Sequence, residues 1–146
     1  MKFELGIGPD SWGVWFPSDP LQPPYEQFLQ EASKAGYRTV ELGPYGYLPT
    51  DARALLPILE ESTLRVSAGF VFGDLHSPDS WEQRKPEVDS VCALLQEVGA
   101  EFCLLTEAMY TDLRTGVQIA PSELNPEEMN ILVENSNRLG AYMAER

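Results

Sequence analysis

The feature that most constrains this chain is a fourfold alternation between two hydrophobic periods. Short β-favouring runs, each closed by glycine, proline or polar residues, are followed by segments whose apolar side chains recur every three or four residues. This pattern predicts the order βαβαβαβα. Strands separated by helices need crossover connections, which are right-handed and give a parallel sheet. We therefore predict an α/β fold of four parallel strands in the order 1-2-3-4, with helices on the outer face.

The four predicted strands differ in how they should be buried. In the first, Phe3, Leu5 and Ile7 alternate with other residues, as in a half-buried strand. The fourth is almost continuously apolar, which favours burial on both faces. The predicted strands are Phe3 to Ile7, Thr39 to Leu42, Leu64 to Phe72 and Phe102 to Leu105.

Each of the first three predicted helices has an apolar face and a terminal signal. The first begins near Tyr25 and ends at Gly36, and the second follows Thr50 or Asp51. Pro57 should kink or shorten the second helix, and Pro86 suggests that the regular part of the third starts there. The inner faces comprise Ala52, Leu55, Leu56 and Leu59 in the second helix, and Val88, Val91, Cys92 and Leu95 in the third.

The fourth helix has the clearest start. Asn125 is the predicted N-cap, Pro126 the first helical residue and Glu128 the capping-box partner. A long polar connection, residues 109–124, precedes it, and loops of this length are usually functional or mobile. The predicted inner face comprises Met129, Leu132, Val133 and Ser136.

Charge and length exclude several classes of protein. A net charge of -13 repels nucleic acid and anionic membrane surfaces, while sugars, cations and basic partners remain compatible with it. The 146 residues suit a single domain, 1-146. Cys92 and Cys103 have neither CxxC spacing nor histidine neighbours, so they predict no zinc site. No apolar run approaches the roughly 20 residues of a membrane span, and the N-terminus lacks a signal-peptide core, so we expect a cytoplasmic protein.

Polar and aromatic residues gather directly after the predicted strands. The carboxyl ends of parallel strands meet at one rim, where α/β proteins bind ligands. Glu41, His76 and Glu107 are the candidate catalytic residues there, because carboxylates and imidazole move protons or bind hydroxyls. Each also has a structural interpretation, an ion pair for the acids and a satisfied hydrogen bond for the histidine. The candidate substrate-binding aromatics, which alternatively only close the barrel mouth, are Trp12, Trp15, Tyr45 and Tyr47.

Two segments resemble a known group of enzymes. They are Gly8-Pro9-Asp10-Ser11-Trp12-Gly13 and Ala35-Gly36-Tyr37-Arg38-Thr39-Val40-Glu41-Leu42-Gly43-Pro44-Tyr45-Gly46-Tyr47. Val66-Ser67-Ala68-Gly69 and the later His76 fit the same pattern. Together they resemble the sugar phosphate isomerase/epimerase group, which includes inosose dehydratases and belongs to the xylose-isomerase-like TIM barrels. The resemblance runs through essentially the whole chain, and it implies the N-terminal (βα)4 half of such a barrel rather than a small open sheet.

The resemblance also implies a chemistry. Members transfer a proton next to a carbonyl of a sugar or cyclitol, through an enediolate, with a divalent metal such as Mn, Mg, Co or Zn. Their metal ligands lie mainly on strands five to eight, so we expect the ligands outside this chain and name no metal-binding residue in it. A full TIM barrel needs roughly 250 residues.

Two other functions stay open. One is a half-barrel that binds a sugar, or assembles with a partner, without turnover. An abasic-site endonuclease shares the fold, but it needs several histidines, whereas this chain has 1 histidine and a charge of -13. The open edges of a half-barrel predict a homodimer, or a complex with the missing half-barrel.

Overall fold

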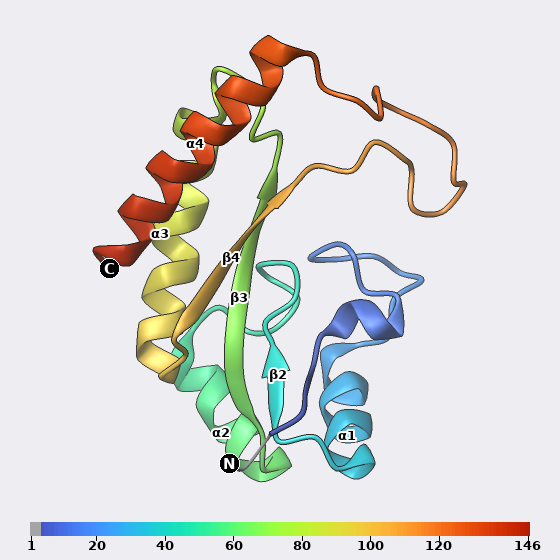
Figure 1. Cartoon of the computed structure of the whole chain (residues 1–146). Helices are drawn as coiled ribbons and strands as arrows, with labels where there is room; N and C mark the ends of the chain where they lie inside the picture. The colour runs from blue at the N-terminus through green and yellow to red at the C-terminus, as the bar shows by residue number, and fades with distance from the viewer. Residues whose placement is uncertain (1–3) are drawn as a thin grey trace. The chain divides into compact units, whose positions relative to one another are not determined.

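The structure, a computed structural model, describes residues 4–146 and contains one parallel sheet (Figure 1). The strand order is β1-β2-β3-β4, which confirms the sequential order predicted from the alternation. Four parallel strands that alternate with helices have the arrangement of half a TIM barrel. The strands are β1 (Gly6–Ile7), β2 (Thr39–Glu41), β3 (Arg65–Gly73) and β4 (Phe102–Glu107).

The helices follow the strands in the predicted places. A one-turn helix, η1 (Pro9–Trp12), comes directly after β1. The longer helices are α1 (Tyr25–Ala35), α2 (Ala52–Ser62), α3 (Ser80–Val98) and α4 (Pro126–Ala144). Among residues 4–146, none of these helices combines the length and apolar character that a membrane-crossing segment needs.

The chain divides into two compact units. The first unit comprises Met1–Phe70 and Ser90–Leu104, and the second comprises Val71–Asp89 and Leu105–Arg146. By sequence, β3, β4 and α3 each pass from one unit into the other.

The first unit has a close-packed apolar core. Phe28, Leu29, Val40 and Leu55 are at most 1% exposed. A glycine in β3 allows this packing, since a Cβ atom at Gly69 would lie 3.0 Å from a methyl of Val91. Burying large side chains of this kind contributes about 1.5–3 kcal/mol each, so the core is the main stabilising feature of the unit.

Two strand predictions need correction. The first strand contains only Gly6–Ile7; Leu5 is 74% exposed, and Phe3 lies outside the described residues. The fourth strand is not buried on both faces, because Phe102 is 62% exposed and Leu104 45% exposed. These two side chains alternate with less exposed neighbours, so one face of β4 is partly covered and the other is exposed.

Helix predictions were right in position but partly wrong in orientation. The inner faces of α2 and α3 are buried as predicted, except that Leu56 is exposed, and both helices continue through their prolines. In α4 the buried residues are Asn135 and Leu139, whereas Met129 and Val133 are about half exposed. The packed face of α4 is therefore rotated away from the predicted one.

Candidate functional site

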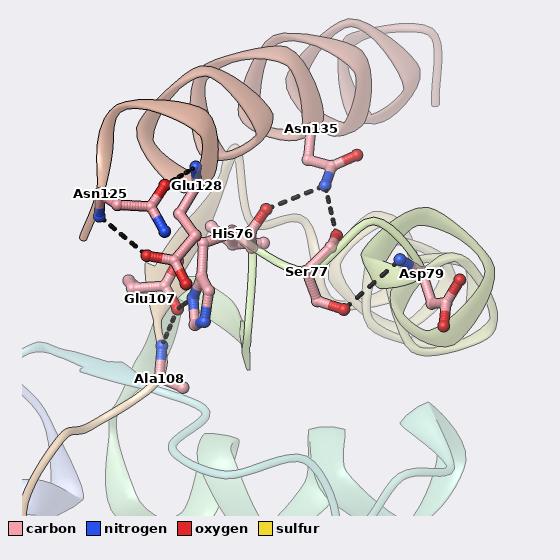
Figure 2. A network of polar contacts seen from close by, with 9 residues as sticks. His76, Ser77, Asp79, Glu107, Ala108, Asn125, Glu128 and Asn135 are labelled. Carbon is pink, nitrogen blue, oxygen red and sulfur yellow. Dashed lines mark hydrogen bonds and ion pairs between the residues drawn. The ribbon is translucent and has the colours of Figure 1, made fainter. Parts of the chain in front are cut away.

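The second unit brings together two of the three predicted catalytic residues. His76 lies in the loop between β3 and α3, and Glu107 is the last residue of β4. Nδ1 of His76 lies 3.1 Å from Oε1 of Glu107, and both side chains are about 30% exposed. Figure 2 shows the imidazole and the carboxylate side by side. The pair is accessible to a ligand while being partly shielded from water.

The two oxygens of Glu107 have different surroundings. Oε1 accepts a hydrogen bond from the backbone N–H of Ala108 at 2.9 Å, in addition to its contact with His76. Oε2 is buried, and it has no hydrogen-bond partner among the residues that the structure describes. A buried oxygen left in this way costs about 1–3 kcal/mol, and more when it is charged. A cation or a donor from a ligand would remove that cost.

Asp74, which was not among the predicted site residues, completes a group of three possible metal ligands. One ligand atom from each of Asp74, His76 and Glu107 lies within 4.8 Å of the other two. Two carboxylates and an imidazole are a donor set that divalent cations accept. With the orphaned Oε2, this donor set fits the divalent metal that the resemblance implies. The sequence signal was the spacing Asp74-x-His76 directly after a strand.

Helix α4 holds the loop that carries His76. The Asn135 side chain donates to the carbonyl oxygen of Leu75 at 2.9 Å and to that of Ser77 at 2.8 Å. Asn135 is buried, and so is Leu75, the residue immediately before His76 in the sequence. Figure 2 shows the amide reaching from α4 to the backbone on both sides of His76. The loop backbone is thereby fixed while the imidazole remains partly accessible.

The predicted capping box positions the start of α4. Oδ1 of Asn125 accepts from the backbone N–H groups of Glu127 and Glu128, and the Glu128 carboxylate accepts from the Asn125 backbone N–H (Figure 2). A box of this kind satisfies donors at both ends of the first turn. It fixes where the helix begins, and hence which turn presents Asn135 to the loop.

Glu41, the third predicted catalytic residue, lies in the first unit beside Asp10. Burial raises the pKa of the Glu41 carboxyl, and the charge of Asp10 raises it further. The register between β2 and β3 slips at this point, since Val40 pairs with Val66 but Glu41 pairs with Ala68. Irregularities of this kind often redirect a side chain near functional sites. A half-buried carboxyl with a raised pKa is suited to holding and releasing a proton.

The four predicted substrate-binding aromatics also lie in the first unit, in different environments. Trp15 is 42% exposed, and Tyr45 is half-buried. Nε1 of Trp12 donates to Oε2 of Glu31 at 2.6 Å. Tyr47 is buried, its hydroxyl donates to the carbonyl of Pro23 at 3.1 Å, and burial raises its pKa to about 12. Contact between these rings and a ligand stays a prediction.

Comparison with known proteins identifies the fold. The chain matches a xylose isomerase-like TIM barrel protein from Mycobacterium smegmatis in complex with magnesium, with a TM-score of 0.68 at 14% identity, over 97% of this chain. It matches D-psicose 3-epimerase with D-tagatose from Clostridium cellulolyticum H10 with a TM-score of 0.62 at 15% identity, over 98% of this chain. It also matches an AP endonuclease of family 2 from Brucella melitensis, with a TM-score of 0.61 at 16% identity, over 98% of this chain.

In each case the chain spans about half of the other protein, covering 52%, 49% and 52% of those chains respectively. No family model matches the sequence, and no curated protein does. At these identities the likeness establishes the fold alone, which is that of half a TIM barrel.

Proposed function

We propose that this chain, with the fold of half a xylose isomerase-like TIM barrel, belongs to a protein that performs metal-assisted proton transfer on a sugar or cyclitol. The reaction would be an isomerisation, an epimerisation or a dehydration. The observation that carries the proposal is the contact between His76 and Glu107, with Asp74 beside them, at the carboxyl ends of β3 and β4. Ligands bind at these strand ends in parallel α/β folds.

The chemistry follows from what these side chains can do. The imidazole of His76 and the carboxylate of Glu107 can bind substrate hydroxyls, and in the absence of a bound ion they can hold a proton between them. Burial raises the pKa of Glu41. We propose that this residue contacts the substrate or relays a proton within the first unit. Trp12, Trp15, Tyr45 and Tyr47 are proposed to contact the apolar face of the sugar.

A divalent ion is the proposed cofactor. Asp74, His76 and Glu107 are the residues of this chain that would hold it. Such an ion, when bound, stabilises negative charge on a substrate oxygen next to the carbonyl. The orphaned Oε2 of Glu107 is the observation that supports a cation at this position.

The fold neighbours support the substrate class without fixing it. One is described as a D-psicose 3-epimerase with D-tagatose, and another as a probable 3-DHS dehydratase from Bacillus anthracis. A third is described as an AP endonuclease. A phosphate backbone suits this chain poorly, because its net charge is -13.

Turnover of a defined panel tests the proposed function. Purified chain, supplied with Mn²⁺, Co²⁺ or Mg²⁺, is incubated with ketoses and inososes, and the products are identified by NMR. We expect a new isomer, epimer or dehydrated product with at least one substrate. Sugar binding without any product would instead support a binding module.

A second candidate, an assembly module, is favoured by the exposed strand β4. Phe102 and Leu104 present apolar side chains on a strand that lies at the end of the described sheet order. Exposed apolar edge strands are avoided in isolated proteins because they pair with other chains. We propose that this edge is covered in a homodimer, or by the other half of a barrel.

A further inference from the structure

We propose that Asp74, His76 and Glu107 form a three-ligand site that holds a divalent transition-metal ion within this chain alone. The inference deepens the proposed function, and it differs from the expectation that the metal ligands lie outside the chain. All three residues belong to the second unit, so the site needs no residue from the first.

The spacing of the side chains matches that of ligands around one ion. Ligand atoms about 2.1 Å from a common ion lie about 3.0–3.4 Å from one another in octahedral or tetrahedral geometry. Nδ1 of His76 and Oε1 of Glu107 are already 3.1 Å apart. The donor atoms of all three residues lie within 4.8 Å of one another, and Asp74 is exposed, so rotation of its side chain can complete the site.

Two further observations indicate a cation at this position. Oε2 of Glu107 is buried, and it has no hydrogen-bond partner among the described residues. A buried carboxylate oxygen normally has a proton donor or a cation as its partner, and this one has neither among those residues. Asn135 fixes the loop backbone on both sides of His76. Groups behind the ligands that fix their orientation are typical of metal sites.

The donor types indicate which ions should bind. Mg²⁺ and Ca²⁺ prefer oxygen ligands, whereas Co²⁺, Ni²⁺ and Zn²⁺ also bind imidazole well. One nitrogen and two carboxylates therefore favour transition metals over Mg²⁺. Three protein ligands also leave coordination positions open, which is the arrangement of catalytic sites, where water or a substrate oxygen takes the open position.

The single histidine makes the test specific. In untagged chain, the ring of His76 gives the only histidine signals in a proton NMR spectrum, because the sequence has 1 histidine. Co²⁺ is added in the absence of any sugar, and its binding is measured by calorimetry and by the paramagnetic shift of these signals. We expect one ion per chain, a strong shift of the His76 ring, and affinity for Co²⁺ at least about tenfold higher than for Mg²⁺.

Matched variants separate this site from general attraction of cations to an acidic protein. Asp74→Asn and Glu107→Gln should each weaken Co²⁺ binding at least about tenfold. Asp79→Asn removes an exposed charge three residues after His76 but outside the ligand group, and should leave the affinity within about twofold of the unaltered chain.

Equal weakening by Asp79→Asn, or an unshifted His76 ring, would overturn the proposal. Circular dichroism melts confirm folding, and if Glu107→Gln does not fold, the exposed Asp74 variant carries the test. The binding experiment contains no sugar, so its result does not depend on turnover. A chain that binds the ion here but converts no sugar in the turnover panel would refute the proposed function and leave the metal site standing.

Discussion

Asn135 holds the backbone on both sides of His76, because its amide donates to the carbonyl oxygens of Leu75 and Ser77. One buried polar side chain on α4 thus sets the position of the only histidine in the sequence. Since Glu107 approaches that histidine from β4, the candidate site depends on three elements meeting: the β3–α3 loop, the end of β4 and the third turn of α4.

Replacing this amide should destabilise the protein and loosen the loop. Asn135→Ala removes two hydrogen bonds and leaves the Leu75 carbonyl without this donor. The Ser77 carbonyl keeps the backbone N–H of Ser80, so we expect a cost of roughly 1–3 kcal/mol. Urea unfolding measures this cost. Asn137→Ala, on the exposed side of the same helix, is the matched control and should change stability by less than about 0.5 kcal/mol. Equal effects of the two variants would show that only helix propensity had changed.

Much of the fold was predictable from local pattern, but the orientation of α4 was not. The strand order follows from the alternation of periods, and the start of α4 follows from Asn125, Pro126 and Glu128. The orientation of α4 was wrong because Met129 and Val133 were counted as core, whereas the buried position belongs to Asn135. Whether an amide is buried depends on distant carbonyl partners, which no hydrophobic period contains.

The site was predictable to a similar extent. His76 and Glu107 were identified from their places after strands, and the structure brings them into contact. Asp74 was not identified, because its spacing to His76 after a strand does not by itself distinguish a ligand from an exposed, solvated aspartate. The two-sided burial expected for β4 was wrong because an apolar run does not reveal whether another strand or chain covers it.

Neutralising Glu41 should stabilise the chain at neutral pH. Burial and the charge of Asp10 raise the pKa of the Glu41 carboxyl in the folded protein. The protonated carboxyl therefore contributes its full stability below the pKa of the unfolded chain, and this contribution is lost as the pH rises through the folded-state pKa. Glu41→Gln should therefore raise the free energy of unfolding at pH 7, by less than about 1 kcal/mol given partial exposure. The gain should vanish in acid, as measured by urea unfolding at several pH values.

The partner of Glu41 provides the control for that experiment. Asp10→Asn should lower the pKa of Glu41, because it removes the neighbouring negative charge. NMR titration of the Glu41 side-chain carboxyl measures this directly. An unchanged titration midpoint would mean that burial alone sets the pKa.

Tyr47 should ionise well above the ordinary tyrosine pKa. Burial raises its pKa to about 12, and its neutral hydroxyl donates to the carbonyl of Pro23. Its stabilising contribution is therefore full below the ordinary tyrosine pKa of about 10 and is lost as pH rises through the folded value. Tyr47→Phe should remove one late-titrating group from the ultraviolet absorbance of tyrosinate and cost about 1 kcal/mol at neutral pH. Loss of an early-titrating group would contradict the burial of Tyr47.

The exposed face of β4 should promote association. Light scattering after size exclusion, across a dilution series, is expected to show a dimer that dissociates on dilution, since Phe102 and Leu104 expose apolar surface. Leu104→Lys, which places a charge on this strand, should shift the protein to monomer. A monomer at every concentration would mean that the strand edge is not an interface for a second copy.

We propose that the group formed by Asp74, His76 and Glu107 supports proton transfer next to a carbonyl. The most direct measurement is deuterium incorporation at the carbon beside the carbonyl of a ketose or inosose, followed by NMR in D₂O with Co²⁺-loaded chain. We predict exchange above the rate with Co²⁺ alone, lowered at least about tenfold in Glu107→Gln and retained in Asp79→Asn. Exchange that is equal in all three proteins, or no faster than with the free ion, would contradict the claim.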